Sequence, residues 1–434
     1  MTMSKLTRIL LSVAAVVFLA ASALFAQDYK LEQVTIASRH SVRAPLEKNI
    51  SRMSEIVADP TCWHKWSVPG SNLTLKGGAL EVLMGQYFKL YYAQEGLFPV
   101  NNDSADGIYF AASSRQRTIA TARSFAAGFL PMATVEIDYM HPEGSADSAF
   151  LPLLNDVAPD FYADAFQSEA QREIAEIIKE NAADLKSAYT LLENVVGYEH
   201  SYVGARNKHL NTWVGVAINI RRPSGERNEP SIIGDLKLAD IASDAIILQY
   251  LEEPDLLKAG FGHNLSLAEW RTLSSIKDIY GKILFTAPIV AVNVSHDILE
   301  RIYQEMNVPG RKFSFLCMHD TSIQALLTAL QAEPYILPEE TTIEAITPIG
   351  FKFIIEKYDL DGEKFARLRL VYQTSDQIRN QTILDLDTPP ACFDLFFKGL
   401  TPNADGYYRW EDFEQRIKET LDAFSKTAKG ERPF

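Results

Sequence analysis

Short apolar runs that predict buried strands stand near both ends of the chain. One covers residues 34–38 and another residues 313–318, and each leads directly into charged residues. A run at residues 108–112 and an alternating segment at residues 135–139 also have the pattern of strands. These runs predict a β-sheet built from the N-terminal and C-terminal parts of the chain.

Two more apolar runs, at residues 349–355 and 366–372, flank the turn sequence Asp361-Gly362. This pattern predicts a β-hairpin. Helical periodicity occurs near the earlier strands, at residues 79–95 and 118–129. Strands and helices therefore alternate in the first part of the chain.

Between residues 141 and 288 the strand signals fade and helical periodicity takes over. The helices predicted there cover residues 163–192, 236–257 and 267–284. Strands and helices on both sides of this block predict a three-layer α/β/α domain with a mixed, mostly parallel sheet. We expect an α/β core from residues 27–140 and 289–434, and a smaller, mainly helical domain inserted at residues 141–288.

The first 26 residues have the form of a signal peptide. Lys5 and Arg8 precede an apolar stretch at residues 9–19, and small residues follow it. No later stretch reaches the roughly 18 uninterrupted apolar residues that a membrane helix needs. The pattern predicts an exported protein, periplasmic or secreted, with no membrane segment after signal cleavage.

The chain has 42 basic and 56 acidic residues, and its formal net charge of −14 argues against a nucleic-acid partner. An acidic protein that handles an anionic substrate has to gather positive charge locally. The three cysteines are too few to predict a disulfide framework. A bond between Cys62 and Cys392 stays open, and Cys317 is expected in the core.

Positive charge gathers directly after the apolar run at residues 34–38. His40 stands between Arg39 and Arg43, and Pro45 ends the loop by fixing its φ angle. Guanidinium groups hold phosphoryl oxygens in bidentate hydrogen bonds, and an imidazole placed between them is suited to attack phosphorus. We interpret His40 as a nucleophile and the two arginines as ligands of a phosphate group.

The apolar run at residues 313–318 leads into His319 and Asp320. The leaving group of a nucleophilic reaction needs a proton donor, and a carboxylic acid next to an anion site is suited to that task. A helix start is the simpler interpretation of Asp320, because Asp favours helix N-termini. The two roles are compatible.

A third predicted strand is followed by Arg117, at the start of a helix, where anions bind favourably. Arg115 is the alternative at this position. In open α/β sheets, ligands bind beyond the carboxyl ends of the strands. We therefore expect one crevice to collect Arg39, His40, Arg43, Arg117, His319 and Asp320.

These motifs resemble the histidine acid phosphatases, branch 2 of the histidine phosphatase superfamily, whose signature is an Arg-His-Gly-x-Arg-x-Pro loop and a distant His-Asp pair. Among the members of that family, the chain is most similar to the bacterial periplasmic glucose-1-phosphatases. Ser41 replaces the signature glycine, and Leu400 and Tyr408 stand where relatives often have cysteines. The segments that carry the resemblance are residues 39–46, 73–82, 116–122, 319–322, 347–350 and 371–380.

The resemblance implies an exported phosphomonoester hydrolase that acts on glucose 1-phosphate or similar sugar phosphates. His40 would form a phosphohistidine intermediate. Asp320 would protonate the leaving alcohol, which implies an acidic pH optimum. The phosphate ligands would be Arg39, Arg43, Arg117 and His319. The resemblance implies neither a metal nor a cofactor, and the oligomeric state stays open.

Two alternatives remain. A phytase or inositol polyphosphate phosphatase of the same family would use the same residues with a broader pocket. A non-catalytic periplasmic sugar- or anion-binding protein would belong to a different class, but it would not need both His40 and Asp320. The other histidines lack metal-ligand spacing. Gly77 and Gly78 match no phosphate-binding glycine motif, so a turn before the next helix is the interpretation there.

Overall fold

The computed structural model describes residues 28–155, 160–220 and 228–434, so the predicted signal peptide lies outside the described residues. The main sheet has the strand order β2-β5-β1-β6-β7-β8, and β9 pairs with β7. A separate small sheet pairs β3 (Gly215–Ala217) with β4 (Ser231–Ile233). The strands of the main sheet are β1 (Lys30–Arg39), β2 (Ile108–Ala112), β5 (Phe313–Met318), β6 (Lys352–Leu360), β7 (Glu363–Tyr372), β8 (Ala391–Asp394) and β9 (Tyr408–Arg409).

The helices predicted from periodicity are present, and additional ones include the long helices α10 and α13. No single helix in the described residues is long and apolar enough to cross a membrane, although α9 and α10 reach that size together across a bend of 87°. The α-helices are α2 (Ile50–Ile56), α3 (Leu75–Gln94), α4 (Gln116–Phe129), α5 (Asp160–Val196), α6 (Gly204–Asn207), α7 (Leu236–Glu252), α8 (Leu256–Ala259), α9 (Leu267–Phe285), α10 (Pro288–Met306), α11 (Asp320–Ala329), α12 (Ser375–Asn380) and α13 (Trp410–Thr427).

The main sheet is mixed, as predicted, but it is not mostly parallel. β5 pairs in parallel with both β1 and β2. The pairings of β6 with β1 and β7, and of β7 with β8 and β9, are antiparallel. The predicted hairpin explains the difference, because strands joined by a tight turn have to run antiparallel and here they extend one side of the sheet.

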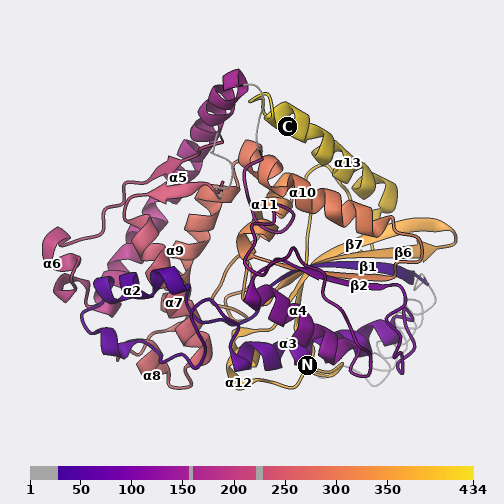
Figure 1. The fold of residues 1–434 in the computed structure, drawn as a ribbon, viewed down its shortest axis with the longest axis horizontal. Coiled ribbons are helices and arrows are strands. Elements are labelled where there is room, and N and C mark those ends of the chain that lie inside the picture. Colours follow the sequence, from indigo (N-terminus) through magenta and orange to yellow (C-terminus); the bar gives the residue numbers. More distant parts are fainter. Residues whose placement is uncertain (1–27, 156–159, 221–227) are drawn as a thin grey trace, which may run out of the picture.

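Helices cover both faces of the main sheet and give the predicted three layers (Figure 1). Successive side chains of a strand point to opposite faces, so one apolar strand serves both layers. On β5, Phe313, Phe315 and Cys317 pack with α3 and α4. Leu316 and Met318 pack with α10, α11 and α13. This two-sided burial explains why residues 313–318 are apolar on both faces, with Ser314 as the one polar residue.

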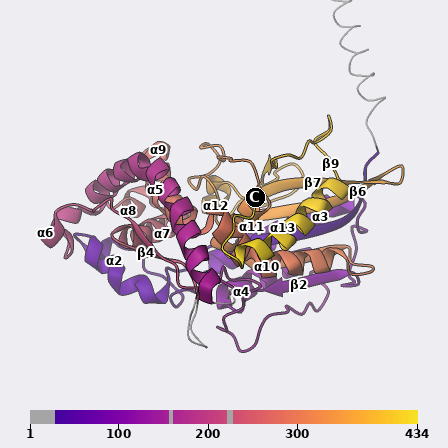
Figure 2. The same cartoon turned by 90° about the horizontal axis from the view of Figure 1, so that it is seen from above.

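The longer helices of the central block, α5, α7 and α9, lie together at one end of the α/β layers, as Figure 2 shows from above. The short helix α2 joins them, because Met53 packs against Ile241 and Ala245 of α7. The helical group thus includes residues that precede the block predicted at residues 141–288. The domain boundaries stay a prediction.

All three cysteines are free thiols. Cys317 is fully buried in β5, as expected, and burial raises the pKa of its thiol well above the ordinary value. Cys62 is partly buried and Cys392 is exposed. The bond between Cys62 and Cys392, which the sequence left open, is not formed.

Two local predictions differ from the structure. In residues 135–139, Asp138 makes an isolated bridge to Ala111 instead of belonging to a full strand. Helix α3 begins at Leu75 rather than at residue 79, because the Thr74 hydroxyl caps it by accepting from the N–H of Gly77 at 3.0 Å. Gly77 therefore lies inside the first turn of the helix. A Cβ at this position would lie 2.2 Å from the carbonyl oxygen of Val42, so only glycine fits there.

A fully buried ion pair joins α3 to β6. Lys352 Nζ lies 3.2 and 3.1 Å from Oε1 and Oε2 of Glu81, and 2.8 Å from the carbonyl oxygen of Gly350. Both charged side chains have zero exposure. The N–H of Gly350 donates to the carbonyl of His40 at 3.2 Å. The ion pair therefore lies directly behind the loop that carries His40.

Replacing Glu81 by Leu is expected to lower the free energy of unfolding by about 3–5 kcal/mol, because it leaves the charge of Lys352 buried without a partner. The double variant Glu81→Leu/Lys352→Met removes both charges and should recover most of that loss. Urea unfolding of the two variants and the parent protein measures the difference. A double variant no more stable than the single one would contradict this account of the pair.

Candidate active site

His40 directly follows β1, and both neighbouring segments hold its backbone. Its N–H donates to the carbonyl of Met318 at 3.1 Å, and its carbonyl accepts from the N–H of Gly350 at 3.2 Å. Met318 is the last residue of β5, and Gly350 precedes β6. The position of the imidazole is therefore set by the sheet itself.

The imidazole of His40 is held in one tautomer. Its Nδ1 lies 2.9 Å from the carbonyl oxygen of Ser41, which can only accept a hydrogen bond, so Nδ1 carries the hydrogen and Nε2 keeps its lone pair. Burial lowers the pKa of His40 well below the ordinary value, and the charges of Arg117 and Arg43 lower it further. The ring is therefore neutral over a wider acidic range than that of an ordinary histidine.

Arg43 connects the His40 loop to the helical group. Its Nη2 lies 3.0 Å from both carboxylate oxygens of Asp244, on α7. Both side chains are largely buried. This ion pair fixes the guanidinium of Arg43 at the edge of the site.

Arg117 is the second residue of α4, and it lies beside His319. Its Nη2 is 3.4 Å from Nδ1 of His319, whose Nε2 is 3.3 Å from Oγ of Ser113. No carboxylate in the described part of the chain forms an ion pair with Arg117. Burial and the charge of Arg43 lower the pKa of Arg117 to about 9. Two buried guanidiniums of like charge are stabilised by an anion bound between them.

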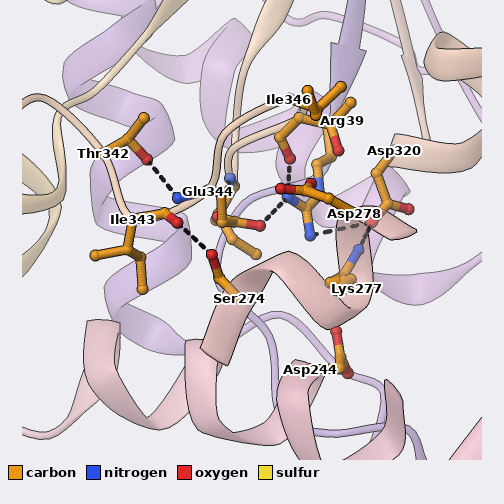
Figure 3. Close-up of polar contacts among 12 residues, drawn as sticks. Arg39, Asp244, Ser274, Lys277, Asp278, Asp320, Thr342, Ile343, Glu344 and Ile346 are labelled. Atoms are coloured by element: carbon orange, nitrogen blue, oxygen red, sulfur yellow. Dashed lines mark hydrogen bonds and ion pairs between the residues drawn. The ribbon is translucent and has the colours of Figure 1, made fainter. Parts of the chain in front are cut away.

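Asp320 begins α11 and contacts two cations and a backbone N–H; Figure 3 shows the contacts with the cations, Arg39 and Lys277. Its Oδ2 lies 3.2 Å from Nη2 of Arg39 and also contacts Nζ of Lys277. Its Oδ1 accepts from the N–H of Thr321 at 3.0 Å. These contacts with two cations and an N–H group favour the ionised form of Asp320.

The pKa of Asp320 bears on its expected role as proton donor. Burial alone would raise the pKa, but the charges of Lys277 and Arg39 hold it well below the ordinary value. The expectation that Asp320 acts as the acid rested on its place next to the anion site and on the resemblance. It did not include Lys277, which no sequence motif pointed to.

A cavity of about 670 Å³ opens at these strand ends. Arg39 is fully buried and does not line the cavity. It contacts Asp320, which does line it. Arg115, the alternative to Arg117, also faces the cavity, but its Nη1 donates to the carbonyl of Gly144 at 2.7 Å. The structure thus brings the remaining predicted residues to one space, lined by His40, Arg43, Arg117, His319 and Asp320.

Sequence reasoning missed the residues that the helical group contributes. Asp240 and Asp244 of α7 and Lys277 and Asp278 of α9 also line the cavity. The sequence held a weak indication of these residues. Asp244 interrupts a long apolar run in a predicted helix, and Asp240 lies one helical turn before it. Burial raises the pKa of Asp240 to about 8, with Asp244 adding to the shift against the opposing effect of Lys277.

Comparisons with known proteins identify the family of the chain. The family model described as histidine phosphatase superfamily (branch 2) matches residues 30–373. The glucose-1-phosphatase of Providencia rettgeri is 33% identical over 409 residues, which cover 91% of this chain and 93% of that protein. Phytase AppA of Escherichia coli is 27% identical over 413 residues, or 90% and 92% of the two chains.

A solved structure shows the same fold at lower identity. The phytase of Hafnia alvei in complex with tartrate superposes with a TM-score of 0.79 at 22% identity, covering 91% of this chain and 98% of that chain. The matched family model includes the loop of His40, the helix of Arg117 and the His319-Asp320 pair. The chain belongs to branch 2 of the histidine phosphatase superfamily, and it is a phosphatase.

Replacing Arg117 by Gln is expected to move the acid limb of the pH profile of kcat/KM to higher pH. As the predicted nucleophile, His40 would have to be neutral, and the charge of Arg117 is one cause of its low pKa, so removing that charge raises the pKa of His40. The same change should lower kcat/KM about 100-fold or more, because it removes a predicted phosphate ligand.

The control is Arg117→Lys, which keeps the positive charge and should keep the acid limb near that of the parent protein. One aryl phosphate is used throughout, so that ionisation of the substrate contributes equally to every profile. An acid limb at the same pH in Arg117→Gln and the parent would show that Arg117 does not set the pKa of His40.

Proposed function

We propose that the protein hydrolyses phosphomonoesters through a phosphohistidine at His40. The observation that carries this proposal is the cavity in which the free Nε2 side of one buried imidazole meets Arg43, Arg117 and His319. Such donors match the oxygens of a phosphoryl group and stabilise the charge that it develops during transfer. Asp320, in contact with Lys277, lines the part of the cavity in which we place the leaving alcohol.

The reaction proceeds in two steps on this arrangement. Nε2 of His40 attacks phosphorus, and the alcohol departs as the phosphohistidine forms. Water then attacks the phosphohistidine and releases phosphate. Arg43 and Arg117 hold the phosphoryl oxygens in both steps, while Arg39 acts from beneath by holding Asp320.

We propose a sugar phosphate such as glucose 1-phosphate as the substrate. The similarity to a glucose-1-phosphatase supports this choice, and so does the chemistry of the wall formed by α7 and α9. Asp240, Asp244 and Asp278 line that wall. Carboxyl groups, whether ionised or protonated, pair well with the hydroxyls of a neutral polyol, but they offer no positive charge to a leaving group that carries further phosphates.

An inositol polyphosphate is the second candidate substrate, because the chain is also similar to a phytase. Further positively charged side chains that line the cavity favour it: Lys48, Arg52 and Lys237. Arg52 is on α2, and Lys237 is on α7 together with Asp240 and Asp244. We further propose that the protein works outside the cytoplasm, periplasmic or secreted, which the N-terminal sequence pattern supports.

Replacing His40 by Ala should abolish turnover of a simple aryl phosphate, because no nucleophile remains. Acid quenching of the parent protein during turnover should trap one phosphoryl group on His40, and mixing should release a burst of the alcohol. The matched control is His209→Ala, a largely exposed histidine on the helical group, which should behave like the parent. Unimpaired hydrolysis by His40→Ala would reject the mechanism. A parent protein that binds phosphate without any turnover would indicate the non-catalytic binding protein instead.

A substrate panel should separate the two candidate substrates. We expect kcat/KM for glucose 1-phosphate to exceed that for inositol hexakisphosphate by about tenfold or more, because the carboxyl groups of the wall bind hydroxyls and offer no positive charge to further phosphates. Replacing Asp240 by Asn should narrow the ratio only above about pH 8, where Asp240 is ionised, and should leave it unchanged at acidic pH. A ratio that favours inositol hexakisphosphate in the parent protein would identify a phytase.

A further inference from the structure

A buried lysine that the proposed mechanism does not use lies behind the loop of His40. Lys352 is the first residue of β6, and its ammonium has three N–H donors. Three acceptors surround it: Oε1 and Oε2 of Glu81 at 3.2 and 3.1 Å, and the carbonyl oxygen of Gly350 at 2.8 Å. The ammonium therefore has an acceptor for each donor, and these contacts fix its orientation.

Stability alone does not account for this arrangement. Both side chains of the Glu81–Lys352 pair have zero exposure, so two charges have been taken out of water. Apolar side chains of similar size in the place of a buried ion pair are often as stabilising or more so. The rings of Phe125 and Phe315 lie 5.6 and 5.8 Å from Nζ, so the surroundings are apolar enough to house an uncharged side chain. The place of the pair, next to the loop, points to a role in the site.

A chain of two hydrogen bonds leads from Lys352 to His40. Nζ of Lys352 donates to the carbonyl of Gly350, and the N–H of Gly350 donates to the carbonyl of His40 at 3.2 Å. Gly350 has a φ angle of 72°, and a Cβ at this position would lie 3.1 Å from Oε1 of Glu81 and 3.8 Å from Oγ of Ser41. Gly350 thus lies between the ion pair and the loop, and it transmits the position of one to the other.

The predicted phosphate ligands are held by other contacts. Arg43 is fixed by its ion pair with Asp244 and by a backbone bridge to Leu73. Arg117 belongs to α4. These contacts do not pass through Gly350. A change in the hydrogen-bond chain should therefore act on the imidazole of the loop and leave the two arginines in place.

We propose that Lys352 is a positioning residue that holds His40 in place for attack on phosphorus, through the backbone of Gly350. Glu81 in turn fixes the ammonium of Lys352. This inference rests on the proposed function. The hydrogen-bond chain ends on the carbonyl of His40, next to the Ser41 carbonyl that fixes the tautomer of the ring. Without it, the imidazole can move out of line with the phosphorus atom while phosphate still binds.

The test uses the double variant Glu81→Leu/Lys352→Met, which removes both charges. In single-turnover acid-quench experiments with an aryl phosphate, its rate of phosphohistidine formation should fall about tenfold or more, because a small misplacement of a reacting group is costly. Its inhibition constant for inorganic phosphate should stay within about twofold of the parent value, because the arginine ligands remain. Gly350→Ala disturbs the middle of the chain without removing a charge, since alanine tolerates positive φ poorly, and should show the same separation.

The matched control is Glu356→Leu/Arg369→Met. This pair is also buried, with 2.6 Å between Oε1 of Glu356 and Nη2 of Arg369, and it joins β6 to β7. Glu356 pairs with Val34 in the middle of β1, away from the end that carries His40. The control should therefore form phosphohistidine at the parent rate.

A parent-like labelling rate in the folded Glu81→Leu/Lys352→Met variant would overturn the proposal. If that variant does not fold, the same result in Gly350→Ala overturns it. Equal losses of labelling rate and phosphate affinity would also overturn it, because the pair would then support the site only as part of the fold. A parent protein that gives no phosphohistidine would instead reject the proposed function.

Discussion

The site depends on the burial of one guanidinium. Arg39 has no exposure to solvent, and its Nη groups contact Asp320, the carboxylate of Glu344 at 2.7 Å and the carbonyl of Thr347. A cation removed from water is tolerated only where such acceptors surround it. The end of β1, the start of α11 and the segment before β6 therefore have to close around Arg39, and this closure gives His40 and Asp320 fixed positions.

Two parts of the fold contribute different chemistry to the cavity. The segments that follow β1, β2 and β5 supply the imidazoles and guanidiniums of the proposed phosphate site. The helices α7 and α9 supply carboxyl groups and Lys277. Because the sheet fixes the first set, phosphate chemistry can stay constant while changes in the helical group alter the alcohol that is accepted. This division agrees with similarity to both a glucose-1-phosphatase and a phytase.

The sequence predicted those parts whose signal is local. The apolar run that became β5 and the hairpin of β6 and β7 have unambiguous patterns, and the charged residues at strand ends follow from them directly. The sequence analysis predicted too few antiparallel pairings. Which strands pair depends on contacts between segments that are far apart in the sequence, and local patterns do not report them. Lys277 and Asp240 were missed because a charged residue in a helix looks the same whether it faces solvent or a cavity, and only the packing of α7 and α9 decides between them.

The contact at Gly77 bears on how this loop could be transferred between proteins. The first turn of α3 touches the carbonyl of Val42, three residues before Pro45, and the fit leaves no space for any side chain. The N–H of Thr74 donates to the same carbonyl at 2.9 Å. A grafting experiment that moved the Arg-His loop alone would leave it without this support. The portable unit is the loop together with the opening turn of the helix beneath it.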